Sequence, residues 1–185
     1  MTRRSTPALV GLLTMLVGAA RGDPTEAALP PAPAMKAPTM IKVVLRNARG
    51  RAVGRLTLTE APRGVVVHGT LSGLSPGMHA IHFHETGKCE PPFKTAGGHF
   101  NPTQKSHGML DPNGQHAGDL PNLVVPRSGK LVFEAFAESL TLGSGPNALL
   151  DDDGAAVVIH AHADDHHTQP SGDSGDRIAC GVVTR

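Results

Sequence analysis

Residues 53–71 of this 185-residue chain read VGRLTLTEAPRGVVVHGTL. The stretch holds two short apolar runs, Val53–Leu58 and Val65–Leu71, with turn residues between them. Apolar and polar residues alternate in LTLT at 56–59, and a similar alternation occurs in LVFEAF at 131–136. A period of two gives a strand one buried face and one wet face. These runs therefore predict β-strands that each bury one face.

Short apolar runs separated by turn residues continue along the chain, and no stretch shows a sustained period of 3.6 residues. The 22 glycines and 16 prolines exceed ordinary usage, which suits a fold with many turns. We expect an all-β fold, an antiparallel sandwich or barrel. The remaining predicted strands are Ile41–Leu45, Met78–His84, Lys130–Ala137, Ala155–His160 and Ile178–Val183.

Two long polar segments interrupt these strands, residues 85–122 and 161–177. Both are rich in glycine or histidine, and together they hold most of the chain's 11 histidines. Long loops without regular structure in a compact domain usually carry function. We therefore expect the functional residues to lie on these two loops.

The N-terminus predicts export. Arg3 and Arg4 precede an uncharged apolar run, Ala8–Ala20, and small residues follow, which is the pattern of a secretory signal peptide over residues 1–22. Residues 23–39 are rich in proline and alanine and are interpreted as a tether. Residues 40–185 then form one domain, located in the periplasm or outside the cell.

Charge disfavours two classes of partner. Three of the 17 basic residues and none of the 16 acidic ones lie in residues 1–22, so the mature chain carries 14 against 16, a formal net charge of −2. Such a balance predicts neither nucleic acid nor an anionic membrane surface as a partner. The apolar run is also too short to span a bilayer. The two cysteines of an exported chain suggest one disulfide.

The spacing of the histidines predicts metal binding. In a strand, the pattern His82-x-His84 directs both imidazoles to one face, although a solvated strand face would show the same pattern. His160 ends an apolar strand and can meet this pair across the sheet. A site made only of imidazoles with near-planar geometry favours copper.

A second group lies within the first long loop. His99, His107, His116 and Asp119 supply three nitrogens and one oxygen, which matches tetrahedral zinc. Neighbouring glycines allow a loop to bend around an ion.

With these motifs the chain resembles a copper/zinc superoxide dismutase of the bacterial exported kind, from about Ile41 to Val183. That family implies an eight-stranded antiparallel Greek-key sandwich or barrel with two long functional loops. The motifs that carry the resemblance follow one another in family order: HFH at 82–84, GHFNP at 98–102, HG at 107–108, HAGDL at 116–120, VIH at 158–160 and GDRIACGV at 175–182.

The resemblance implies a role for each motif residue. His82, His84, His99 and His160 would bind copper, and His99, His107, His116 and Asp119 would bind zinc, with His99 bridging the two ions. Asp164 would accept hydrogen bonds from His82 and His107, and so would join the two sites. Arg177 would hold a small anion at the mouth of the copper channel. Cys89 and Cys180 would form the intrasubunit disulfide.

The second long loop carries little of the positive charge that would attract an anionic substrate. The loop from His162 to Asp176 carries four aspartates and no lysine, whereas attraction of an anion needs positive potential nearby. Lys94 and Lys88 are our candidates for steering.

The expected activity is disproportionation of the superoxide anion to oxygen and hydrogen peroxide, with copper and zinc ions and no organic cofactor. The alternative is an exported copper- or zinc-buffering protein without turnover, with His162, His166 and His167 as a capture patch. A zinc hydrolase would need an open position on the metal, which a four-ligand zinc set does not leave. A monomer and a homodimer are both compatible with the sequence.

Overall fold

A computed structural model describes residues 37–185 of the chain. The predicted signal peptide, residues 1–22, and all but the last three residues of the predicted tether, residues 23–39, lie outside the described residues. The first strand begins at Met40.

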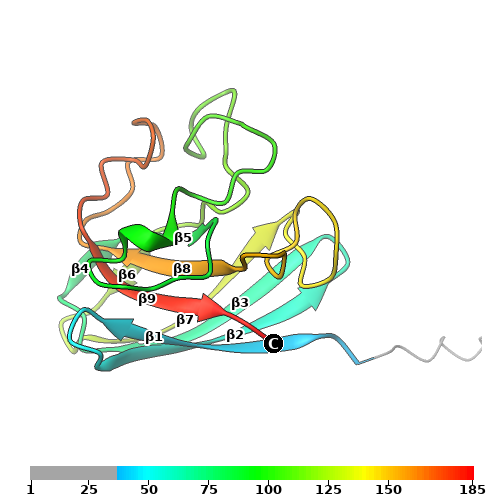
Figure 1. Ribbon diagram of the computed structural model, residues 1–185. Helices are drawn as coiled ribbons and strands as arrows, with labels where there is room; N and C mark the ends of the chain where they lie inside the picture. The colour runs from blue at the N-terminus through cyan, green and yellow to red at the C-terminus, as the bar shows by residue number, and fades with distance from the viewer. Residues whose placement is uncertain (1–36) are drawn as a thin grey trace, which may run out of the picture. The chain divides into compact units, whose positions relative to one another are not determined.

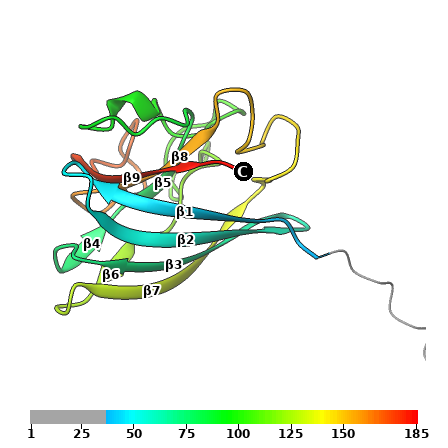
Figure 2. The same cartoon turned by 60° about the horizontal axis from the view of Figure 1, so that its bottom comes forward.

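The described residues form nine β-strands and one turn of 3-10 helix, η1 (Lys94–Ala96). Seven strands make one antiparallel sheet in the order β5-β8-β9-β1-β2-β3-β7, and β4 pairs with β6 (Figures 1 and 2). This confirms the predicted all-β antiparallel class. The strands are β1 (Met40–Asn47), β2 (Ala52–Ala61), β3 (Gly64–Ser72), β4 (Gly77–His79), β5 (Ile81–His84), β6 (Leu123–Val125), β7 (Lys130–Glu138), β8 (Ala155–His160) and β9 (Arg177–Val183).

Residues 53–71 form most of the β2–β3 hairpin. Leu56 and Leu58 are buried and their neighbours in β2 are more exposed, so the alternation has the predicted sense. In β7 the polar face includes Glu134, but Phe136 on the same face is 47% exposed.

The sheet curls so that its two ends enclose one aliphatic core. Side chains from β1, β2 and β3 pack with Phe83 of β5 and with Val157 and Ile159 of β8. Strand β8 is buried on both faces, because Ala156 and Val158 join a second, smaller cluster with Phe93. Phe93 and Ala96 of this cluster belong to the first long loop, so the loop packs directly against the sheet on that side.

The strand count differs from the expected eight. The predicted strand Met78–His84 is interrupted at Ala80, whose amide donates to His162 O and whose carbonyl accepts from the amide of His160. As a result β4 pairs with β6 and β5 pairs with β8.

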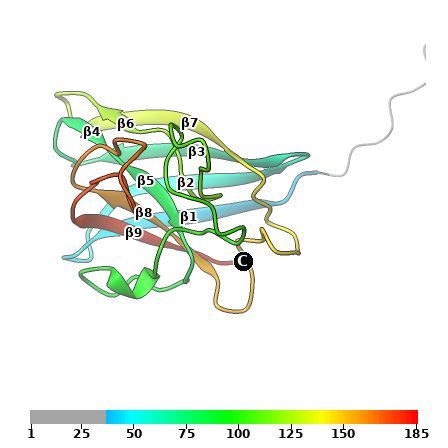
Figure 3. The same ribbon diagram turned by 90° about the horizontal axis from the view of Figure 1, so that it is seen from above.

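Both long loops lie over β5 and β8 on one side of the sheet (Figures 1 and 3). A disulfide between Cys89 and Cys180, with Cα atoms 5.6 Å apart, joins the first loop to β9. Within residues 37–185, no helix has the length and apolar character needed to span a bilayer.

Candidate metal centre

Strand alternation places the first ligand candidates. In β5, Ile81 and Phe83 face the main core, so His82 and His84 lie on the opposite face, beneath the long loops. His160, the last residue of β8, lies beside this pair across the sheet, after a bulge in the register. A bridge between His84 and His99 brings the first long loop onto β5.

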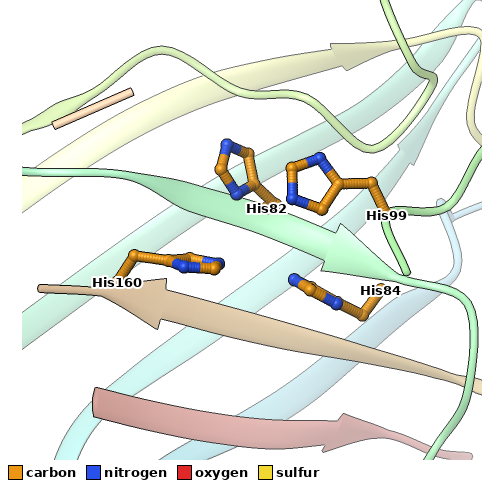
Figure 4. Close-up of side chains that lie close together, drawn as sticks. All are labelled: His82, His84, His99 and His160. Atoms are coloured by element: carbon orange, nitrogen blue, oxygen red, sulfur yellow. The ribbon is translucent and has the colours of Figure 1, made fainter. Parts of the chain in front are cut away.

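These four residues, His82, His84, His99 and His160, form what we call the four-histidine site. All are buried, and each offers a ligand atom within 4.8 Å of the others. Figure 4 shows the four rings around a common space. Among the described residues, the atoms without a hydrogen-bond partner include His82 Nδ1, His84 Nε2, His99 Nε2 and His160 Nε2. Four buried nitrogens in this state are costly unless a cation binds them, so the donor set fits a metal ion.

The opposite nitrogen of each strand histidine is held by the protein. His84 Nδ1 donates to Gly97 O at 3.0 Å, and His160 Nδ1 lies 3.2 Å from Gly175 O. His82 Nε2 donates to Asp164 Oδ2 at 2.8 Å. These bonds fix the ring orientation and leave the other nitrogen free as a ligand.

The second group, which we call the histidine–aspartate site, consists of His99, His107, His116 and Asp119. Asp119 is buried at its centre: Oδ1 lies 2.8 Å from His99 Nδ1, and Oδ2 lies 3.1 Å from His107 Nδ1. His116 Nδ1 lies 3.4 Å from Oδ1. The three nitrogens converge on one carboxylate, which is the donor set and spacing that tetrahedral zinc requires.

His99 belongs to both sites. Its Nδ1 faces Asp119, and its Nε2 is one of the four unpartnered nitrogens of the four-histidine site. One imidazole can therefore contact an ion on each side.

Asp164 connects the two sites from behind. This buried carboxylate accepts from His82 Nε2 at 2.8 Å and from His107 Nε2 at 2.9 Å. Asn122 holds its backbone in two hydrogen bonds, donating to Asp164 O at 2.7 Å and accepting from Asp164 N at 2.8 Å. Gly172 lies against the carboxylate at a φ of 66°, where a Cβ would overlap it. Asn122 and Gly172 could not be predicted from the sequence, because neither lies in a motif.

Burial determines the charge of the four-histidine site. It lowers the pKa of His99 to about 4 and that of His160 to about 3, and it lowers the pKa of His84 well below the usual value. Burial also lowers the pKa of His82, although Asp164 opposes this. These rings are therefore neutral at pH 7 and ready to bind a cation.

In the histidine–aspartate site, hydrogen bonds outweigh burial in setting the pKa of His107. Burial acts to lower the pKa of His107, but hydrogen bonds to Asp119 and Asp164 outweigh it and raise that pKa to about 9. Burial likewise opposes ionisation of both aspartates, yet hydrogen bonds led by His107 lower their pKa values below the usual range. A cation that binds here therefore displaces a proton from His107.

Arg177 begins β9 next to His160 in the register. Its Nη1 donates to Phe93 O at 2.8 Å and its Nη2 donates to Gly97 O at 2.7 Å. Burial lowers its pKa, and the charge of Glu85 opposes the shift. The guanidinium is thus a half-buried cation in a fixed position, beside the ring of His84 that shares the same carbonyl.

Arg177 also lines a cavity of about 710 Å³. Lys94 lines it together with Arg49 from the β1–β2 turn, whereas Lys88 is not among its lining residues. Arg49 was missed in the sequence analysis because it lies 128 positions away along the chain from Arg177 and in no shared motif. Asp176 at the rim reduces the positive potential of the cavity.

The remaining loop histidines join neither site. Among residues 37–185 the two groups contain no member of the predicted capture patch, His162, His166 and His167. His162 and His167 are exposed. His166 lies against Asn122, with 3.2 Å between their side-chain nitrogens.

Comparisons with known proteins give a consistent result. The profile of the copper/zinc superoxide dismutase family matches residues 52–183. "Superoxide dismutase [Cu-Zn]" of Caulobacter vibrioides is 44% identical over 144 residues, which cover 76% of this chain and 83% of the relative. "Superoxide dismutase-like protein YojM" of Bacillus subtilis is 46% identical, over 76% of this chain and 74% of the relative.

Solved structures agree with this assignment. The crystal structure of a SOD-like protein from Bacillus subtilis superposes with a TM-score of 0.76 at 41% identity, over 80% of this chain and all of that one. The Cu/Zn superoxide dismutase from Brucella abortus gives 0.65 at 29% identity, over 79% of this chain and all of that one. With the family profile covering most of the domain and two adjacent donor sets of the expected kind, this chain belongs to the copper/zinc superoxide dismutase family.

Proposed function

We propose that the four-histidine site holds copper, that the histidine–aspartate site holds zinc, and that the protein disproportionates superoxide to oxygen and hydrogen peroxide. The observation that carries this proposal is the set of four buried ring nitrogens that face one another without hydrogen bonds among the described residues. The complete ligand set and the guanidinium beside it favour turnover over metal buffering.

A copper ion held by His82, His84, His99 and His160 would supply the one-electron redox chemistry by which one superoxide is oxidised to oxygen and a second is reduced, with two protons, to hydrogen peroxide. The protein provides the proton transfer and the anion selection around that step.

His99 moves a proton. Its Nε2, which has no hydrogen-bond partner among the described residues, would hold a proton whenever it is not a copper ligand, while Nδ1 would remain in the zinc donor set beside Asp119. An imidazole can take up or give up a proton at one ring nitrogen while the other keeps its partner, which suits His99 to this role.

Arg177 selects the substrate. Two carbonyl groups fix its guanidinium, so its remaining N–H groups can face a small anion without rearrangement. Lys94 and Arg49 add positive charge at the adjoining cavity, and we propose that they guide superoxide toward Arg177 in place of Lys88.

The Cys89–Cys180 bond supports export, because disulfides persist in oxidising compartments, and we place the protein in the periplasm or outside the cell. This setting suits an enzyme that removes superoxide at the cell boundary.

The test is superoxide disproportionation by purified protein loaded with copper and zinc, with bound metal quantified in the same sample. His160→Ala is the matched variant, because it removes one nitrogen from the four-histidine site and leaves the histidine–aspartate site intact. We expect fast turnover that the variant loses. Full loading with both metals but no turnover would leave a metal-buffering protein instead.

A further inference from the structure

Glu85 has no role in the proposed mechanism, but it joins the end of β5 to the loop that carries Gly97 and Gly98. It directly follows His84, and its backbone amide donates to Gly98 O at 3.0 Å. Its side chain returns to the same residue, where Oε1 accepts from Gly98 N at 2.8 Å. Glu85 therefore holds Gly98 at both backbone groups.

The carboxylate also lies against Gly97. A Cβ at Gly97 would be 2.6 Å from Oε1 and 2.7 Å from Cγ of Glu85, and Gly97 has a φ of 75°. Only glycine fits between this side chain and the turn. Gly97 O and Gly98 N belong to one planar peptide group, so the bond from Gly98 N to Glu85 Oε1 also sets the orientation of the Gly97 carbonyl.

That carbonyl has two partners in the active site. It accepts from His84 Nδ1 at 3.0 Å and from Arg177 Nη2 at 2.7 Å. Gly97 O is the shared hydrogen-bond acceptor of a proposed copper ligand and of the arginine that meets the anion. A shift of this one oxygen would turn the ring of His84 and move the guanidinium of Arg177 at the same time.

We propose that Glu85 is a positioning residue: it fixes the carbonyl of Gly97, which in turn orients a copper ligand and the channel arginine. The inference rests on the proposed roles of His84 and Arg177. It is the reach of the carboxylate to Gly98, more than its charge, that performs this role, because the contact that sets the turn is the hydrogen bond from Gly98 N.

Two conservative variants separate reach from charge. Glu85→Gln keeps an oxygen at the position of Oε1 and removes the charge, whereas Glu85→Asp keeps the charge and is one methylene too short to reach Gly98. Glu90→Gln and Glu90→Asp are the matched controls, since Glu90 is an exposed glutamate in the same loop whose carboxylate accepts no hydrogen bond from the described residues.

The first readout needs no metal. We expect the Gly98 amide of the metal-free protein to exchange its hydrogen about fivefold faster in Glu85→Asp than in Glu85→Gln, the factor that corresponds to an ordinary hydrogen bond. Equal exchange in the two variants would overturn the inference, whatever the activity of the protein.

The second readout uses the copper(II)-loaded protein with azide as a small anionic probe. We expect Glu85→Asp to change the copper electron paramagnetic resonance spectrum and to bind azide about fivefold more weakly. Glu85→Gln should keep the wild-type spectrum and bind azide at least as tightly as the wild type, because it removes a negative charge that acts on Arg177. The reverse assignment, with Glu85→Gln altered and Glu85→Asp unchanged, would show that Glu85 acts by charge and would refute a positioning role. Wild-type protein that neither binds azide nor turns over superoxide would refute the proposed function, and the exchange experiment would still decide the role of Glu85.

Discussion

An alanine at position 172 would place its methyl carbon on the carboxylate that joins the two proposed metal sites. That carbon would overlap Asp164 Oδ1 and lie 2.6 Å from Asp164 Cγ and 2.8 Å from His107 Nε2. Asp164 is buried and its backbone is held by Asn122, so the carboxylate has little room to retreat. Gly172→Ala should therefore break the bonds from Asp164 to one or both of its histidines.

The magnitude follows from two contributions. A residue with a side chain at a φ of 66° costs about 1 to 2 kcal/mol, and each hydrogen bond to a charged group contributes about 1.5 to 3 kcal/mol. Gly172→Ala should lower the free energy of unfolding of the metal-free protein by about 2.5 to 5 kcal/mol if one bond is lost and by about 4 to 8 kcal/mol if both are lost. Affinity for copper and zinc should fall by about 10- to 100-fold, as for other changes behind a metal ligand.

Gly50→Ala isolates the backbone contribution. Gly50 has a φ of 75°, and a Cβ there would meet nothing within 4 Å. Urea unfolding of both metal-free variants, followed by competition with a chelator of known affinity, measures the two effects. Equal loss of stability in the two variants, with unchanged metal affinity, would refute the account of Asp164 as the link between the sites.

Three further predictions concern charge, pH and the disulfide. Arg49→Glu should slow the reaction with superoxide about two- to fivefold at low ionic strength. Arg55→Glu makes the same change of charge outside the cavity and should not slow it. The measurement is the stopped-flow rate at increasing salt concentration, and equal rates for the two variants would contradict the prediction. His99 and His160 have folded-state pKa values of about 4 and about 3, below the usual value near 6.5, so their contribution to stability is complete above about pH 6.5 and is lost as pH falls toward these values. Denaturant unfolding of the metal-free protein should show stability decreasing over that interval, and a flat profile there would count against it. Removing the Cys89–Cys180 bond, which closes a separation of 91 residues, should cost about 4 to 5 kcal/mol in the chain-entropy description, measured as a shift of the urea midpoint. No shift would mean that the bond does not restrict the unfolded chain.

Strand periodicity predicted much of the fold. The alternation around Leu56 and Leu58 predicted β2 because one face of that strand packs on the core and the other meets water. Strand β6 has only three residues, too few for a periodic pattern to be visible. The interruption at Ala80 is set by hydrogen bonds to residues about 80 positions away, which no local pattern encodes.

The candidate site likewise contains residues that the sequence predicts and residues that it does not. Histidine spacing predicted that His82 and His84 share a face, and the resemblance to a family placed them with His99 and His160. Residues that support the site from other segments were not predictable, because their role depends on which loops meet. Asn122, Gly172, Arg49 and the carboxylate of Glu85 are of this kind.

The central claim is that two different ions share the imidazole of His99, and anomalous X-ray diffraction at the copper and zinc absorption edges tests it most directly. Crystals of the protein loaded with both metals should show an anomalous peak for copper among His82, His84, His99 and His160. They should show a second peak, for zinc, among His99, His107, His116 and Asp119. Copper in the histidine–aspartate site, or a single peak with one site empty, would contradict the assignment.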